Sequence, residues 1–312
     1  MTGPITIVTF DPRSPQAAAI SALFEHTLVI CGVIGALVTG LVGYCVLRFR
    51  AKPGDPLPIQ VQGNTKLELL WTLIPLAIVG WIFALTLRAA AASDPPAEGD
   101  PDLVVMAHQW WWEIRYPSGA VTANEIHIPA GKRLLVRVES ADVIHDFWVP
   151  QLARKIDAIP GRPNFVSLQA NAPGRYEGTC AEFCGAQHAW MRLVVIAEPP
   201  ADFEAWLRRQ AEPAAAPRSE QARSGARLFA EKTCVACHTI AGSASPPVRV
   251  APDLTHLATR ETLGAGVLEN RPDELARWLK HPQAVKPGCH MPDFRLSDRE
   301  VADLVAYLEE LQ

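Results

Sequence analysis

The sequence has no strong excess of charge of either sign. Its 29 Lys and Arg residues nearly balance its 33 Asp and Glu residues, for a net charge of −4. Proteins that bind nucleic acid typically carry a basic face, so this balance gives no indication of a nucleic-acid partner. No internal repeat is evident. The length of 312 residues predicts two or three domains.

The first 27 residues also lack the basic region that precedes the apolar run of a signal peptide. Two longer runs contain no charge at all: LVICGVIGALVTGLVGYCVL at 28–47 and LLWTLIPLAIVGWIFALTL at 69–87. Each is close to the ~20 residues that an α-helix needs to span a bilayer. A buried core helix or a signal peptide would explain one such run. Two runs joined by a short polar loop predict a transmembrane hairpin, with spans at about 23–48 and 67–89.

The flanks of the two apolar runs predict the orientation of the hairpin. The connecting segment carries Arg48, Arg50, Lys52 and Lys66, whereas the far flank of the second run reads SDPPAEGDPD. Loops rich in Lys and Arg stay on the cytoplasmic side of a membrane. We therefore expect both chain ends, and everything from about residue 90 onward, on the periplasmic side of a bacterial cell membrane.

The rest of the chain changes character twice. Short β-branched and aromatic runs separated by Pro, Gly and Asn come first, and they predict an all-β sandwich or barrel. A stretch rich in Ala, Pro and charge predicts a short helix plus a linker. The last part has a helical pattern, and Ser297 and Glu300 form a capping box before its final helix. The expected segments are the hairpin segment 1–98, the β domain 99–199, the linker 200–219 and the helical domain 220–312.

Soft metal-binding atoms are concentrated in GTCAEFCGAQHAWM, residues 178–191. Cys180, Cys184, His188 and Met191 offer thiolate, imidazole and thioether ligands. This set favours copper, because Ca²⁺ and Mg²⁺ prefer oxygen and zinc rarely takes a thioether. Two thiolates are enough to bridge two copper ions, but a second imidazole is missing and is expected from another strand. The alternative is a disulfide between the two cysteines.

A histidine on an earlier strand supplies the missing imidazole. His145 lies in ADVIHDFWVP, and the later loop reads C-x-E-x-C-x₃-H-x₂-M. Together they resemble subunit II of the haem–copper cytochrome c oxidases, and LELLWTLIP, HQWWW and KIDAIPGR extend the resemblance over most of residues 20–198. The resemblance implies a cupredoxin-like barrel that holds a dinuclear copper centre, CuA.

The resemblance also implies a role for each residue of the motif. The copper ligands would be two bridging thiolates and four terminal groups, namely Cys180, Cys184, His145, His188, Met191 and the backbone carbonyl of Glu182. Bridging thiolates spread one electron over both metals, so the geometry changes little between redox states. The Glu182 carboxylate would point toward subunit I and help to bind a Mg²⁺ or Mn²⁺ ion at that interface.

Trp110 and Glu68 have ordinary explanations as well as functional ones. The pattern of HQWWW predicts a strand, in which the three tryptophans point to alternate faces and at least one is exposed. The ordinary explanation is that the buried rings pack in the core and the exposed ring lies at an interface. The resemblance instead marks Trp110 as the point where electrons reach CuA. Glu68 would by itself be a helix-end residue in the headgroup region. The resemblance places it near the mouth of a proton path into subunit I.

The helical domain contains a second redox motif. FAEKTCVACHTI holds C-x-x-C-H, the pattern of covalent c-type haem attachment. Cys234 and Cys237 would form the thioether bonds, and His238 would be the proximal iron ligand. Half of a zinc site or a redox dithiol is the alternative.

The loop KPGCHMPDF is expected to supply the sixth iron ligand. Cys289, His290 and Met291 stand side by side, and only one of them can face the iron in an extended loop. Thioether ligation favours the high potential that electron donation to CuA requires. We therefore expect Met291 as the ligand, with His290 facing solvent or a haem propionate.

These motifs predict a multi-domain membrane protein with a two-helix transmembrane hairpin, a cupredoxin-like barrel and an all-α cytochrome c domain. By resemblance it would be subunit II of a caa-type cytochrome c oxidase. Electrons would pass from a soluble or membrane-bound cytochrome c-type donor through haem c and CuA to subunit I, where O₂ is reduced. Subunit I, subunit III and the lipid membrane are the expected partners. A CuA-containing nitric oxide reductase is the alternative, and a copper-delivery protein would need neither the full ligand set nor a haem domain.

Overall fold

The chain divides into two compact units in the computed structural model. One unit is Ala18–Ser93, and the other combines Met1–Ala17 with Asp94–Gln312. The residues that the structure describes are 7–56, 59–93, 99–243 and 250–312.

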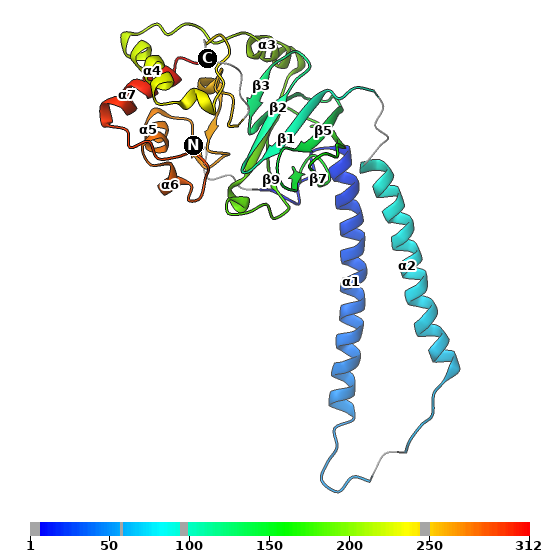
Figure 1. Ribbon diagram of the computed structural model, residues 1–312. Coiled ribbons are helices and arrows are strands. Elements are labelled where there is room, and N and C mark those ends of the chain that lie inside the picture. Colours follow the sequence, from blue (N-terminus) through cyan, green and yellow to red (C-terminus); the bar gives the residue numbers. More distant parts are fainter. Residues whose placement is uncertain (1–6, 57–58, 94–98, 244–249) are drawn as a thin grey trace. The chain divides into compact units, whose positions relative to one another are not determined.

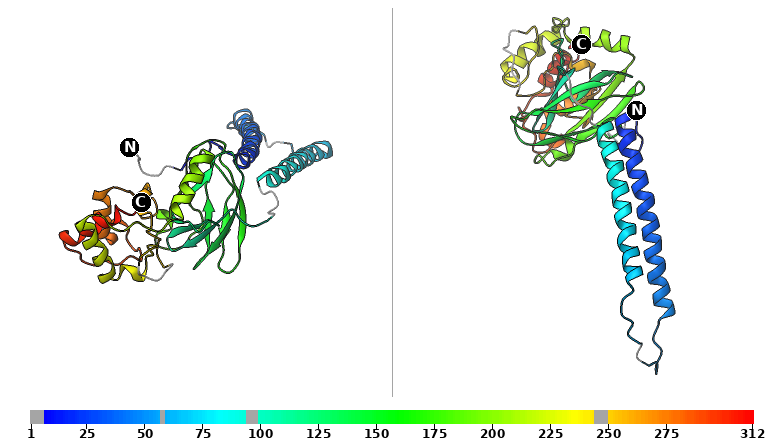
Figure 2. Two further views of the ribbon diagram at one scale, coloured as in Figure 1. Left: turned by 90° about the horizontal axis from the view of Figure 1, so that it is seen from above. Right: turned by 90° about the vertical axis from the view of Figure 1, so that its right-hand side faces the viewer.

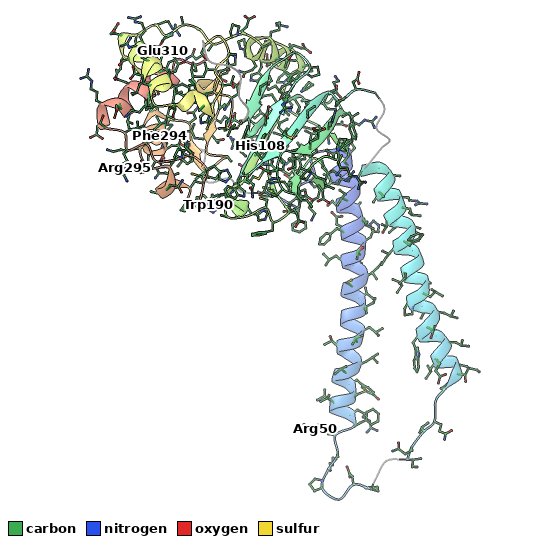
Figure 3. All side chains as sticks on the ribbon, viewed as in Figure 1. Arg50, His108, Trp190, Phe294, Arg295 and Glu310 are labelled. Carbon is green, nitrogen blue, oxygen red and sulfur yellow. The ribbon has the colours of Figure 1, made fainter. Side chains whose placement is uncertain are left out.

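The smaller unit is built from two long helices, α1 (Pro15–Arg48) and α2 (Thr65–Ser93) (Figure 1). Their most apolar stretches have mean hydropathies of 2.3 and 2.1, and among the described residues these two helices are long and apolar enough to cross a membrane. Apolar side chains project from all sides of both helices (Figure 3), as expected for helices that face lipid. Both predicted spans lie inside the observed helices. The acidic flank used to predict orientation lies partly outside the described residues.

The larger unit begins with a β domain whose strands form two five-stranded sheets within residues 99–243. One sheet has the order β3-β2-β1-β5-β8 and the other β4-β10-β9-β6-β7. The pairs β1–β5 and β4–β10 are parallel, whereas the other pairs are antiparallel. The strands are β1 (Leu103–His108), β2 (Trp111–Arg115), β3 (Val121–Ala123), β4 (Glu125–Pro129), β5 (Leu134–Ser140), β6 (His145–Trp148), β7 (Ile156–Ala158), β8 (Asn164–Leu168), β9 (Gly174–Cys180) and β10 (Arg192–Glu198).

The core of this domain forms because alternate residues of its strands are apolar. Burial alternates along β1, along β5 and along β9 from Arg175 onward, so one face of each strand points inward. Trp112, Phe147 and Met191 are fully buried there. The predicted short helix is present as α3 (Pro200–Gln210), which lies against the β domain (Figure 2). Its contacts there are with β4 and β10. Its Phe203 and Trp206 join the β-domain core, so α3 completes that fold.

The expectation of one continuous strand through HQWWW is wrong. β1 ends at His108 and β2 begins at Trp111, so Gln109 and Trp110 form the turn of a hairpin. The Asp142 carboxylate accepts a hydrogen bond from the Gln109 backbone N–H at 2.6 Å, which supports the break. As a result Trp111 and Trp112 are both buried, whereas Trp110 is only partly buried.

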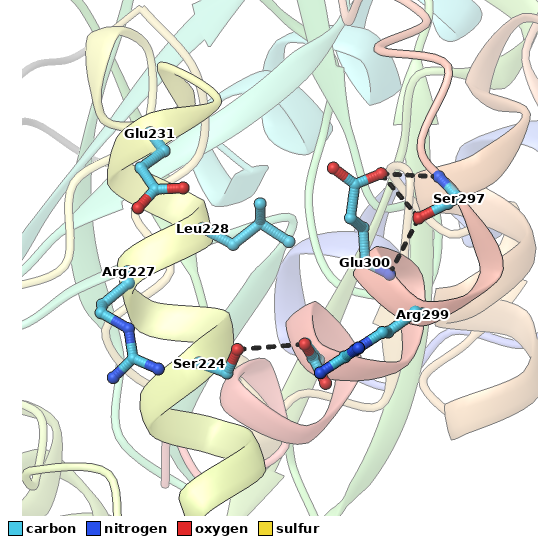
Figure 4. A pocket seen from close by; sticks show the side chains of 8 residues that line it. Ser224, Arg227, Leu228, Glu231, Ser297, Arg299 and Glu300 are labelled. Carbon is cyan, nitrogen blue, oxygen red and sulfur yellow. Dashed lines mark hydrogen bonds between the residues drawn. The ribbon is translucent and has the colours of Figure 1, made fainter.

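The last part of the chain forms a helical domain with its own core. Apart from the small hairpin β11–β12, its regular elements are helices, as the sequence predicts. They are α4 (Glu220–Glu231), the 3₁₀ turns η2 (Cys234–Ala236) and η3 (Leu257–Thr259), β11 (Thr262–Leu263), β12 (Leu268–Glu269), α5 (Pro272–Lys280), α6 (Pro282–Val285) and α7 (Asp298–Leu308). The predicted capping box is confirmed at the start of α7 (Figure 4). The side chains of Ser297 and Glu300 each accept a hydrogen bond from the backbone N–H of the other residue.

The helices α4 and α7 cross at Gly225. A Cβ atom at this position would overlap the backbone oxygen of Asp303 and lie 2.7 Å from Cβ of Tyr307. Neither neighbour can move without shifting α7, so the close approach requires glycine. Beside the crossing, a pocket of about 350 Å³ is lined by charged side chains of both helices, including Arg227, Glu231 and Arg299 (Figure 4).

We expect Gly225→Ala to destabilise the helical domain by about 1–3 kcal/mol or more, because the added methyl group overpacks the crossing. Hydrogen exchange of the α4 and α7 amides measures this effect domain by domain. Arg227→Ala, an exposed change on the same helix, should stay within about 0.5 kcal/mol of the parent. Equal protection in both variants would contradict the close-packed crossing.

Candidate metal centre and haem site

The structure brings the two cysteines of the predicted copper loop together. Cys180 ends β9, Cys184 lies in the following loop, and both are buried. Their sulfur atoms are 3.8 Å apart, far beyond the ~2.05 Å of a disulfide bond. Metal–thiolate bonds are about 2.3 Å long, so one ion can contact both sulfurs at this spacing. The spacing therefore excludes a disulfide bond in this structure and would allow both sulfurs to contact one metal ion.

Four further donor groups surround this pair. The Nδ1 atoms of His145 and His188 lie 3.9 Å from Cys180 Sγ and 3.6 Å from Cys184 Sγ, respectively. Met191 Sδ lies 3.9 Å from Cys184 Sγ, and the carbonyl oxygen of Glu182 lies 3.2 Å from Cys180 Sγ. The ligand atoms of His145, Cys180 and Cys184 all lie within 4.8 Å of one another. The soft, mixed donor set fits copper.

The two thiols influence each other's protonation. The hydrogen bond between the two sulfur atoms lowers the pKa of Cys180 well below its usual range. The same bond, followed by burial, raises the pKa of Cys184. One thiol of the pair therefore ionises readily, whereas the second ionises only beside a compensating cation. A bound metal ion supplies this positive charge.

Asp142 orients His145, the histidine that comes from an earlier strand. Its Oδ1 atom lies 2.8 Å from Nε2 of His145, which leaves Nδ1 facing the cysteines. Metal-binding histidines commonly donate their second ring N–H to a carboxylate in this way. Burial tends to lower the pKa of His145, but its contacts with Cys180 and Asp142 outweigh burial and raise it. Asp142 is not among the residues that the sequence patterns predict, although its position three residues before His145 was a usable signal.

The turn that carries Trp110 lies directly on the cysteine loop. Trp110 Nε1 and Gln109 Nε2 both donate to the carbonyl oxygen of Cys184, at 2.9 and 2.8 Å. Gly185 has φ of +115°, and a Cβ atom there would lie 3.0 Å from the Trp110 ring. Glycine therefore allows the indole to approach the loop closely.

The C-x-x-C-H motif folds into a compact turn. The backbone N–H groups of Cys237 and His238 both donate to the carbonyl oxygen of Cys234. His238 Nδ1 lies 2.7 Å from the carbonyl oxygen of Pro252, so Nε2 remains available to bind iron. Burial lowers the pKa of His238, which keeps the imidazole in the neutral form that a metal ligand needs. These residues fit a haem.

In the distal loop the three adjacent candidates have different surroundings. Met291 packs against the apolar core of the helical domain. The Cys289 sulfur accepts a hydrogen bond from Gln283 Nε2 at 3.3 Å. His290 is exposed, and its ring centroid lies 4.8 Å from that of Trp110. Of the three candidate iron ligands, Met291 is thus the one that packs on the core of the helical domain.

Glu68 lies in the first turn of α2 and is exposed within its unit. Asn64 precedes it, and its side-chain oxygen accepts hydrogen bonds from the backbone N–H groups of Lys66 and Leu67. An acidic side chain at this position also complements the positive end of the helix dipole. The backbone N–H of Glu68 donates to the carbonyl oxygen of Asn64 at 2.9 Å, as expected for a residue at the start of a helix.

The fold and the two donor sets define a membrane-anchored redox protein with a cupredoxin-like domain and a cytochrome c domain. Three family descriptions match the chain: "Cytochrome C oxidase subunit II, transmembrane domain" over residues 4–88, "Cytochrome C oxidase subunit II, periplasmic domain" over 119–198, and "Cytochrome c" over 222–312. The chain belongs to the cytochrome c oxidase subunit II family, in a form with a fused cytochrome c domain, and is part of a haem–copper oxidase complex.

Named relatives match most of the chain. "Cytochrome c oxidase subunit 2" of Alkalihalophilus pseudofirmus is 33% identical, over 99% of this chain and 92% of the relative. The Bacillus subtilis protein of that name is 32% identical, over 86% of this chain and 82% of the relative. A crystal structure of the periplasmic domain of subunit II from Bradyrhizobium japonicum is 30% identical and covers 36% of this chain and 95% of its own, with a TM-score of 0.35.

Proposed function

We propose that this chain passes electrons, one at a time, from an external cytochrome c-type donor through its haem domain and its copper domain to subunit I. The observation that supports this most is the pair of buried thiols 3.8 Å apart with imidazole, thioether and carbonyl groups around it. When bound, haem c and the dinuclear CuA centre each take up and release one electron without breaking bonds. A rigid β scaffold around the ligands keeps the energy needed for rearrangement small.

In this proposal Cys180 and Cys184 would hold the two copper ions through their thiolates. His145, His188, Met191 and the Glu182 carbonyl would complete the set of copper ligands. On the haem side, Cys234 and Cys237 would attach the haem covalently, and His238 and Met291 would bind its iron. The hydrogen bond from His238 to the Pro252 carbonyl fixes the orientation of the ring that binds the iron.

Trp110 is proposed as the residue through which electrons reach the copper ligands. Its indole N–H donates to the carbonyl of Cys184, so a hydrogen bond connects the ring to the backbone of a bridging ligand. The ring is partly exposed, which leaves one side accessible to a donor.

Purification of the full chain with its natural partners tests the proposal. We expect two copper ions and one covalently bound haem c per chain, a haem–copper subunit I in the complex, and reduction of both centres by a reduced cytochrome c-type protein. A chain that carries haem but no copper, with an active oxidase bound, would overturn the proposal.

The Glu182 side chain is proposed to bind Mg²⁺ or Mn²⁺ at the interface with subunit I. It is exposed, whereas its carbonyl oxygen lies 3.2 Å from Cys180 Sγ, so the two ends of the residue face different surroundings. One residue would in this way connect the copper site to the subunit interface.

Glu182→Gln should therefore keep both copper ions but weaken Mn²⁺ binding at least ~10-fold, since a backbone ligand survives the replacement and a carboxylate ligand does not. Electron paramagnetic resonance of the Mn²⁺-substituted complex measures this. Glu204→Gln, an exposed carboxylate change on α3, serves as the control and should leave Mn²⁺ binding unchanged. Full Mn²⁺ occupancy in Glu182→Gln would mean that the carboxylate is not a ligand.

The membrane part of the proposal concerns location and proton supply. The hairpin would cross a bacterial inner membrane with both termini and both redox domains on the periplasmic side, against subunit I and with subunit III in the same complex. Glu68, at the start of α2, would lie near the mouth of a proton path into subunit I. The basic residues between α1 and α2 support this orientation.

A further inference from the structure

The loop between α6 and α7 contacts the β domain where Trp110 lies. We call this part of the β domain the Trp110 surface; it consists of Gln109, Trp110, Gly185, Ala186 and Gln187. The His290 ring lies 4.8 Å from the Trp110 ring. Gln187 Nε2 donates to the carbonyl oxygen of Pro287, and a Cβ atom on Gly288 would lie 3.5 Å from that of Ala186. The haem-domain loop therefore follows the edge of the copper loop.

Lys286 is the charged group at the centre of this contact. Its side chain is almost fully buried, with 4% exposed. The ammonium donates to the carbonyl oxygen of Trp110 at 3.2 Å and to that of Gly264 at 3.0 Å, so it joins a residue of the β domain to one of the haem domain. Burial lowers the pKa of Lys286 to about 8. At neutral pH the Lys286 amine is therefore protonated in most molecules. A buried charge is tolerated only when acceptors surround it.

Glu125 makes a second connection between the same two domains. It begins β4 and is 1% exposed. Its carboxylate accepts hydrogen bonds from the backbone N–H groups of Glu261 and Thr262 at 2.9 Å, and from the Thr262 hydroxyl at 3.1 Å. Close by, the Arg192 N–H donates to the carbonyl oxygen of Ala265 at 3.3 Å. Hydrogen bonds with residues of the β domain thus hold the segment around β11 in place.

We propose that Lys286 is a positioning residue that, together with Glu125, holds the haem domain on the Trp110 surface. The partner that fits this surface is then the protein's own haem domain rather than an external cytochrome. An external donor would have to deliver its electron to the haem domain, which passes it on across the contact between His290 and Trp110. The transfer involves one electron and no proton: ferrous haem c becomes ferric, and the copper centre is reduced by one electron. The electron transfer rests on the proposed function, whereas the docking of the haem domain does not.

Hydrogen exchange of the full chain, carrying haem and copper within its complex, tests the docking. The reporters are the amides of Glu261 and Thr262, which donate to Glu125. We expect them to be protected in the parent and to exchange at least ~10-fold faster in Lys286→Met, because a hydrogen-bonded charge at the contact is lost. Lys280→Met removes an ammonium that pairs with Asp298 inside the haem domain, and it should leave these amides unchanged.

Glu125→Gln separates docking from folding of the haem domain. The change lies in the β domain, so faster exchange of Glu261 and Thr262 cannot come from a misfolded haem domain. An unchanged haem absorption spectrum confirms that the haem domain is intact. Unprotected reporter amides in the parent, or protection that survives both Lys286→Met and Glu125→Gln, would overturn the docking proposal.

Flash reduction of haem c followed by copper reduction tests the transfer across His290 and Trp110. We expect the intramolecular rate to fall at least ~10-fold in Lys286→Met and in His290→Ala, with unchanged copper content and an unchanged haem potential. A normal rate alongside faster amide exchange would overturn this route while leaving the proposed function in place. Loss of copper or haem from the parent chain would instead contradict the proposed function.

Discussion

Replacing Cys184 by serine is expected to abolish the dinuclear copper centre and to stop electron flow at the haem domain. Cys184 contacts three other donors: its sulfur lies 3.8 Å from Cys180 Sγ, 3.6 Å from His188 Nδ1 and 3.9 Å from Met191 Sδ. A serine hydroxyl is a hard, protonated oxygen at neutral pH and cannot replace a soft bridging thiolate. The copper content should fall below two per chain, and oxidase turnover should fall to background.

Metal analysis and stopped-flow spectroscopy of the purified complex measure both effects. Haem c should still be reduced by the donor and should then stay reduced. The matched control is Cys45→Ser in α1, where the thiol is remote in sequence from both donor sets, and copper content should be normal. Normal turnover in Cys184→Ser would exclude the bridging role.

Replacing Met291 by alanine is expected to have the second large effect, on the haem potential. Among the three adjacent candidates, Met291 packs on the haem-domain core, whereas His290 turns toward Trp110. Loss of the thioether should remove the weak near-infrared sulfur–iron charge-transfer band. It should also lower the potential by on the order of 0.1 V or more, within the roughly 0.8 V range that axial ligands span.

Near-infrared absorption and a redox titration of the full chain give the two measurements. His290→Ala should leave the band and the potential nearly intact, because this ring is exposed and lies 4.8 Å from the Trp110 ring of the β domain. If His290→Ala loses ligation and Met291→Ala keeps it, the ligand role belongs to His290.

The expected linker illustrates how tertiary contacts extend what composition predicts. Its Ala- and Pro-rich sequence predicts a short helix and a connecting segment. The helix is present, but Trp206 packs in the β-domain core and stacks on His127 at 3.9 Å between ring centroids. Further along, the N–H of Ala214 donates to the carbonyl oxygen of Ala241, and that of Arg218 to the Glu310 carboxylate. Composition cannot reveal these bonds, because each one joins residues distant in sequence.

The HQWWW stretch shows the opposite case, in which a local pattern predicted the wrong element. β-Branched and aromatic residues favour a strand, and the stretch contains no glycine or proline to mark a turn. The hairpin turn at Gln109–Trp110 is stabilised instead by Asp142, thirty-three residues later, and by the Cys184 carbonyl. These distant acceptors outweigh the local preference for an extended strand.

The sequence by itself determined the chemistry of this protein: two uncharged spans, a copper-type donor loop and a C-x-x-C-H motif. These features are readable because their residues are neighbours in the chain, so spacing alone brings the donor atoms together. Only the tertiary structure decided how the donors are oriented and connected. Asp142 orients His145, Gly185 lets Trp110 approach Cys184, and Lys286 contacts a carbonyl 176 residues away. Such contacts depend on strand pairing and on the docking of two separate cores, and the free energy of burying each group depends on everything packed around it.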